Sequence, residues 1–186
     1  MRKNVLIILL FCCFGLCAHA QKFDGYVVTN ENDTIKCKLF APTNPFDEKL
    51  VAIYSIHDKI KILTDKGETK KYTTKDLKSF LIKGTKFGDL KWVSLEQDGR
   101  KRFYHEVQAG RLMFYRFYKG PPAIGIGFGL KDGKFVELQG RELRQRLGEF
   151  IADYPELHSK WMDSDKYYKP RELEDVIKLY NDHFKN

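Results

Sequence analysis

Cations and aromatic residues are interleaved in two neighbouring segments of this chain, residues 100–105 and residues 111–119. Aromatic rings can stack on sugars or bases, and arginines can form paired hydrogen bonds with phosphate or carboxylate groups. We therefore predict that residues 100–119 form a hairpin that carries a binding surface. The candidate binding residues are Arg102, Tyr104, Arg111, Tyr115, Arg116 and Tyr118.

A second interpretation of the same two segments needs no ligand. Side chains alternate between the two faces of a strand, so one aromatic face can be core while the cations border the other face. This interpretation predicts buried tyrosine rings, and it stays open beside the binding site.

Three glycines alternate with apolar residues in the segment 125–129, which invites comparison with a nucleotide-binding loop. Glycines that bind a dinucleotide must open a helix, because the helix N-terminal amides hold the phosphates. Here the segment leads instead into Asp132-Gly133, a typical hairpin turn. The pattern predicts a strand whose glycine face lets another element approach closely.

Metal binding and catalysis lack a recognisable motif in the sequence. His57, His105, His158 and His183 have no second histidine at metal-ligand spacing, so we predict no metal site and no cofactor. No Gly-x-Ser-x-Gly nucleophile motif occurs, so we predict no catalytic residues and a non-enzymatic protein. The alternative is an enzyme that acts on envelope glycans or lipids through residues that converge only in the fold.

The elements that must position these residues are mainly short strands. From residue 21 to residue 139, β-branched and aromatic residues alternate with polar ones between turn residues. From Gly140 onward the apolar spacing becomes helical, with helices expected at 141–152, at 155–163 and from Pro170. We predict an α+β fold in one domain: an antiparallel β-meander, as a curved sheet or partly open barrel, followed by two or three C-terminal helices packed on it.

Two strand pairs are expected in the first part of the meander. Residues 25–29 and 34–39 form a hairpin, in which Lys36 and Lys38 occupy the face opposite to the apolar residues. Residues 51–56 and 59–64 form a second pair around His57-Asp58. Segment 83–89 is expected to be a loop because it contains two glycines.

Residues 1–20 have the pattern of a secretory signal peptide. Two cations precede an apolar run that is too short to span a bilayer, and Ala18-His19-Ala20 is a small-x-small cleavage site. A buried helix and a lipoprotein anchor at Cys17 are weaker alternatives, the latter because the bulky Leu16 precedes that cysteine. The mature chain would begin at Gln21, lack a transmembrane segment and keep Cys37 as its single cysteine, which excludes an internal disulfide.

The charge balance limits the classes of partner. The chain has a formal net charge of +8, of which the leader contributes two, so the remainder carries +6. Basic exported proteins meet anionic lipids and acidic glycans before they meet nucleic acid. We therefore expect an envelope protein, an anionic glycan or an anionic lipid as partner, and no nucleic acid.

Short motifs at both ends of the chain resemble a known group of proteins. They are Gly25-Tyr26-Val27-Val28, the segment 33–39 beginning Asp-Thr-Ile, and the tail segments 153–157 and 176–181. These motifs resemble those of uncharacterised exported proteins from Bacteroidetes-type bacteria, although Cys37 stands where that group usually has glycine. The resemblance implies a Gram-negative envelope setting, periplasmic or extracellular, and supplies no activity or cofactor. Together these observations predict an exported, envelope-associated binding or interaction module.

Overall fold

The computed structural model describes residues 20–121, 123–163 and 166–185. Residues 1–19 of the expected signal peptide lie outside the described residues. The strands are β1 (Ala20–Thr29), β2 (Thr34–Asn44), β3 (Asp47–Val51), β4 (Lys59–Leu63), β5 (Thr69–Thr73), β6 (Leu77–Thr85), β7 (Gly88–Gln97), β8 (Arg100–Gln108), β9 (Met113–Lys119), β10 (Ile124–Lys131) and β11 (Lys134–Glu137). The helices are α2 (Leu143–Ile151), α3 (Pro155–Met162) and α4 (Leu173–His183), with short 3₁₀ turns η1 (Ile53–Ser55), η2 (Gly140–Glu142) and η3 (Pro170–Glu172).

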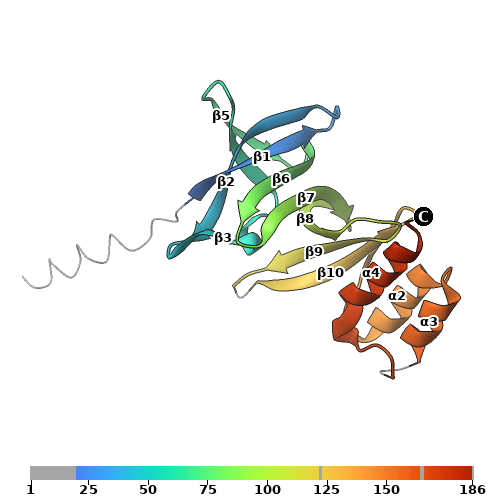
Figure 1. The fold of residues 1–186 in the computed structure, drawn as a ribbon. Coiled ribbons are helices and arrows are strands. Elements are labelled where there is room, and N and C mark those ends of the chain that lie inside the picture. The colour runs from blue at the N-terminus through green and yellow to red at the C-terminus, as the bar shows by residue number, and fades with distance from the viewer. Residues whose placement is uncertain (1–19, 122, 164–165, 186) are drawn as a thin grey trace, which may run out of the picture.

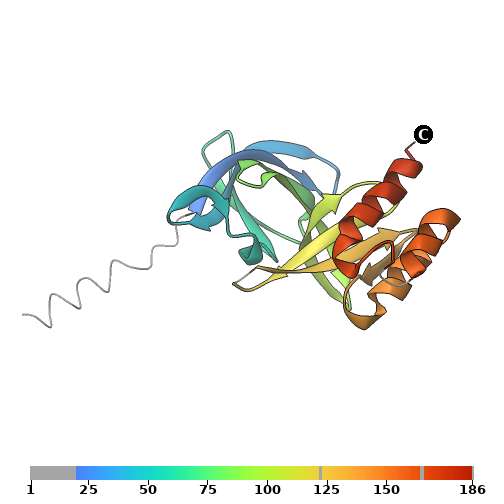
Figure 2. The same ribbon diagram turned by 60° about the horizontal axis from the view of Figure 1, so that its bottom comes forward.

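All strand pairs are antiparallel, and the strands form one curved sheet that is not closed (Figure 1). Their order is β11-β10-β9-β8-β7-β6-β1-β2-β4-β5, with β3 paired to β2. The three helices follow the last strand and lie at the β9–β10 end of the molecule (Figure 2). The predicted α+β class, with a curved antiparallel meander and C-terminal helices, is confirmed.

Asp-Gly turns join two of the hairpins, one of them the turn predicted at Asp132-Gly133. Asp98 and Gly99 have φ angles of 51° and 70°, and Asp132 and Gly133 have φ angles of 50° and 77°. Two consecutive residues with positive φ are typical of the type I′ turn, whose twist matches that of the flanking strands. These local signals place the β7–β8 and β10–β11 hairpins correctly.

The expected pair of residues 51–56 with residues 59–64 is wrong. Val51 ends β3, and Ile53–Ser55 is a 3₁₀ turn in which the amide of Ile56 donates to the carbonyl of Ile53. These backbone groups cannot also form a ladder, so β4 pairs with β2 and β5 instead. The expected loop at 83–89 is also mostly strand, because β6 continues to Thr85 and pairs there with Gly88.

The sheet divides where β8 leaves β9. The two strands pair from His105 toward the C-terminus of β8, and beyond that point His57 lies between them. The amide of Phe103 donates to the His57 carbonyl at 2.7 Å, and His57 Nε2 lies 2.8 Å from the Tyr118 carbonyl. His57 therefore joins the curled strands β1–β8 to the part of the sheet that carries the helices.

Buried side chains form a separate cluster on each side of this division. One cluster fills the concave side of the curled strands, and a second lies between β9–β11 and the helices. A third cluster, around Tyr104 and Phe128, lies on the opposite face of β8–β10. Gly127 and Gly129 face the second cluster, where a Cβ would come within 3.0 Å of Phe114 and Phe150 side-chain atoms respectively. The β10 glycines thus permit the close packing predicted for them.

Candidate functional site

The three tyrosines predicted as binding residues belong to the core. Tyr104 and Tyr115 are each 1% exposed, and Tyr118 is 9% exposed. The ring of Tyr104 packs edge-on against that of Phe128, with centroids 5.2 Å apart, and Tyr118 approaches Trp92 at 6.3 Å. These rings cannot present a stacking surface to an external ligand without rearrangement of the core.

The arginines of the same hairpin mostly hold the helices to the sheet. Arg111 pairs with Asp153 at 2.8 Å, and Arg116 pairs with Glu174. Arg102 lies on the other face of the sheet, 5.2 Å from the centre of the Phe117 ring. The six predicted residues therefore do not share one open surface, because strand alternation sends Tyr115 and Arg116 to opposite faces. Ligand binding by this hairpin stays a prediction that its geometry does not favour.

His105 is a half-buried titratable group whose Nδ1 lies 3.1 Å from the Tyr118 hydroxyl. Burial, with a smaller contribution from the positive charge of Arg116, lowers the pKa of His105 from 6.5 to about 4. The ring is therefore neutral at neutral pH.

Acidification is expected to destabilise the protein through His105. The unfolded chain binds a proton at this residue below about pH 6.5, whereas the folded chain does so only near pH 4, so stability is lost as the pH falls between these values. We expect a loss of about 2 kcal/mol between pH 7 and pH 4.5, measured by urea denaturation. The variant His105→Gln should lose clearly less over the same interval, and an equal loss in both proteins would contradict the assignment.

Metal and thiol chemistry receive no support from the described residues. In the part of the chain that the structure describes, no three His, Cys, Asp or Glu side chains come together as a metal site. Cys37 is buried, and burial, followed by the nearby Asp65, raises the pKa of its thiol to about 11. A protonated, buried thiol is a poor nucleophile.

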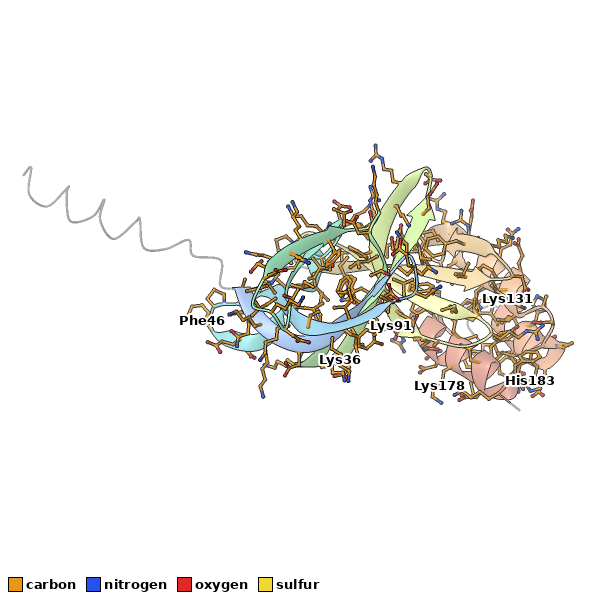
Figure 3. All side chains as sticks on the ribbon, turned by 90° about the horizontal axis from the view of Figure 1, so that it is seen from above. Lys36, Phe46, Lys91, Lys131, Lys178 and His183 are labelled. Carbon is orange, nitrogen blue, oxygen red and sulfur yellow. The ribbon has the colours of Figure 1, made fainter. Side chains whose placement is uncertain are left out.

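Exposed lysines gather on the outer face of strands β6, β1, β2, β4 and β5. The register and the alternation of buried residues place seven exposed lysines on this convex face. We call it the lysine face; its residues are Lys22, Lys36, Lys38, Lys59, Lys61, Lys71 and Lys83. Within these five fully described strands Asp24 is the one carboxylate on that face, and it lies 3.6 Å from Lys38. Lys36 is labelled on this surface in Figure 3.

One row of the lysine face crosses four strands. Lys22 on β1 pairs with Phe40 on β2, Phe40 with Lys61 on β4, and Lys61 with Lys71 on β5. The ammonium groups of Lys22 and Lys61 lie 5.5 Å and 5.2 Å from the centre of the Phe40 ring. Like charges directly opposite each other, as in Lys61 and Lys71, destabilise a sheet by up to about 1 kcal/mol. An anion that bridges the two lysines would remove this cost.

A cavity of about 600 Å³ opens beside this row on the lysine face. Its lining includes three lysines, Lys36, Lys38 and Lys83, together with Tyr26 and the acidic Asp24. The loop after β4 closes one side with Asp65 and Gly67. The volume falls within the range of natural small-ligand sites, and the lining combines three basic residues with two acidic residues and an aromatic residue.

The sequence does not predict a site on the lysine face, although it contains part of the pattern that indicates it. The alternation of Lys36 and Lys38 opposite to apolar residues already indicated an outward basic edge on one hairpin. The missing information was the position of β4, which was expected beside residues 51–56 and lies beside β2. Only that neighbour brings Lys61 next to Phe40 and completes the row.

The described helices are all too short or too polar to cross a membrane. No protein-family model, curated protein or solved structure matches the chain.

Proposed function

We propose that this protein is an exported, non-enzymatic binding module of a Gram-negative envelope, and that its lysine face holds an anionic glycan or lipid. The observation that supports this proposal is the concentration of seven lysines against one carboxylate on a single convex face. Phosphate and carboxylate groups are the anions that such a face attracts. The leader pattern at residues 1–20 supports export, and the resemblance to exported envelope proteins supports the setting.

Protection of a sheet edge is the competing explanation for exposed lysines, because edge strands often carry them to prevent aggregation. It can account for Lys71, since β5 is the last strand of the sheet. It does not account for Lys38 and Lys61, because each of them is paired with a residue on both neighbouring strands. A function in binding explains the interior lysines as well as the edge lysine.

Charge reversal on the lysine face is the direct test. The variant Lys36→Glu/Lys61→Glu/Lys71→Glu should bind a soluble phosphorylated oligosaccharide released from lipopolysaccharide at least about 30-fold more weakly than the unmodified protein. Binding by the unmodified protein should also weaken with salt, because the Debye length shortens. Isothermal titration calorimetry at two salt concentrations measures both effects. Intact lipopolysaccharide, titrated in parallel, distinguishes a preference for the glycan from a preference for the lipid.

The matched control is Arg100→Glu/Lys101→Glu/Arg141→Glu, which changes the net charge by the same amount at exposed positions away from the lysine face. It should bind within about threefold of the unmodified protein. An equal loss of oligosaccharide affinity in the control would show that net charge alone causes the loss, and it would overturn the proposed site. A failure of the unmodified protein to bind either probe at low salt would overturn the glycan or lipid proposal in favour of an acidic envelope protein.

A further inference from the structure

Large apolar side chains are exposed in two places in the described part of the chain. Phe46, Phe87 and Ile124 are 98%, 54% and 64% exposed. Met162, Tyr167 and Leu179, which are 42%, 51% and 45% exposed, belong to the helical region. Figure 3 shows Phe46 at the end of the molecule opposite to the helix that carries Lys178 and His183. Phe46 and the helical region therefore mark opposite ends of the molecule.

The first group gathers three separate turns at one end. Phe46 lies in the β2–β3 turn, Phe87 in the β6–β7 turn, and Ile124 begins β10. These three residues or their neighbours in the chain line one cavity of about 300 Å³. Its lining includes Pro45, Phe87 and Ala123 together with residues of β3 and η1. The amide of Lys86 also donates to the carbonyl of Lys49 at 2.8 Å, which holds the β6–β7 turn against β3. We call Phe46, Phe87 and Ile124 the apolar tips.

The charges around the apolar tips do not oppose an anionic surface. Asp47 is paired to Lys86 at 2.6 Å, and the exposed Glu48 is followed directly by the exposed Lys49. Lys119, at the end of β9, adds a further exposed cation close to Ile124.

The apolar tips adjoin the lysine face. Strand β2 runs from Phe40, in the lysine row, through Pro42 to the β2–β3 turn that contains Phe46. A cavity of about 320 Å³ is lined by both Phe40 and Pro42, and also by Lys59, Lys61 and Lys71. One end of the molecule thus combines exposed apolar tips with a broad cationic surface. This combination is typical of proteins that insert into an anionic lipid interface, where apolar area and electrostatic attraction add.

We infer that this end docks onto an anionic lipid surface, with the apolar tips inserted at the level of the headgroups and the neighbouring lysines bound to lipid phosphates. The inference rests on the proposed function of the lysine face and names a membrane as the source of its anions. Three apolar side chains in separate segments are compatible with a fluid lipid surface, because each can insert among the lipids without a complementary pocket. A protein partner and a second copy of the chain are the other occupants that the test distinguishes.

The test compares two triple variants in co-sedimentation with vesicles of phosphatidylethanolamine and phosphatidylglycerol. Phe46→Ser/Phe87→Ser/Ile124→Ser should bind these vesicles at least about tenfold more weakly than the unmodified protein. Met162→Ser/Tyr167→Ser/Leu179→Ser replaces the three large apolar side chains exposed at the helical end and should bind within about twofold of the unmodified protein. At about 0.5 M NaCl the charge contribution is screened, and the remaining vesicle binding should require the apolar tips.

The soluble phosphorylated oligosaccharide separates failure of this inference from failure of the proposed function. The tip variant should bind that oligosaccharide normally, because the lysine face is intact. Normal vesicle binding by the tip variant would overturn insertion and leave the lysine-face proposal standing. Failure of the unmodified protein to bind the oligosaccharide, intact lipopolysaccharide or the vesicles would overturn both. If the unmodified protein ignores vesicles but self-associates through the tips in sedimentation velocity experiments, the occupant is a second copy and the lipid inference is wrong.

Discussion

Replacement of Gly25 by alanine is expected to lower the free energy of unfolding by about 4 kcal/mol, one of the largest effects of any single substitution in this chain. A Cβ at this position would collide with the carbonyl oxygen of Leu81 and lie 2.6 Å from Cδ1 of Leu39. The backbone oxygen cannot rotate away as a side chain could. Gly25 also pairs with Cys37 on one side and Ile82 on the other, so β1 cannot shift without breaking a ladder.

Gly148→Ala is the matched control for this prediction. The new Cβ would meet Sδ of Met162 at 2.7 Å, but that atom is near the end of a flexible, partly exposed side chain. Gly148 lies inside α2, where alanine is favoured over glycine by about 1 kcal/mol. Guanidinium denaturation followed by circular dichroism should therefore place Gly148→Ala at or above the stability of the unmodified protein. Equal stabilities of the two alanine variants would contradict the close approach at Gly25.

The second large effect is expected at Asn181, whose side chain joins α4 to the chain just before β9. Its Oδ1 accepts a hydrogen bond from the Leu112 amide at 2.9 Å, and its Nδ2 donates to the Leu112 carbonyl at 2.8 Å. Asn181 is 4% exposed and Leu112 is fully buried, so water cannot replace either bond. Asn181→Leu leaves a buried donor and a buried acceptor unpaired, which should cost about 3 kcal/mol.

Lys178→Leu, on the exposed side of the same helix, is the control for Asn181→Leu. It removes a solvent-exposed ion pair with Asp182 and should change stability by less than about 1 kcal/mol. Hydrogen exchange supplies a specific readout, because the Leu112 amide should lose its protection in Asn181→Leu and keep it in Lys178→Leu. Retained protection together with unchanged stability in Asn181→Leu would show that α4 is held to the sheet by its apolar contacts alone.

Core packing explains why the predicted hairpin site has the geometry of a structural element. The sequence predicts a ligand for Arg111 and Arg116 because cations beside aromatic residues suit recognition. In the structure Arg111 pairs with Asp153 and Arg116 pairs with Glu174, and both carboxylates come from the helical region, far along the chain. The sequence pattern of the hairpin is the same in either case. A binding hairpin and a structural hairpin differ in what their arginines pair with, a ligand or a carboxylate of the same chain, and local residue spacing does not specify which.

The sequence by itself determined the local features of this protein. The Asp-Gly dipeptides placed two hairpins, the alternation of residues identified most strands and the face of Lys36, and the change to helical spacing at Gly140 identified the helices. Each of these signals acts within a few residues, through backbone conformation and side-chain period. The tertiary structure alone decided that β4 lies beside β2 and that Lys22, Phe40, Lys61 and Lys71 form one row. Neighbours and register between distant strands depend on how their apolar faces pack into a shared core, and that packing energy belongs to the whole chain.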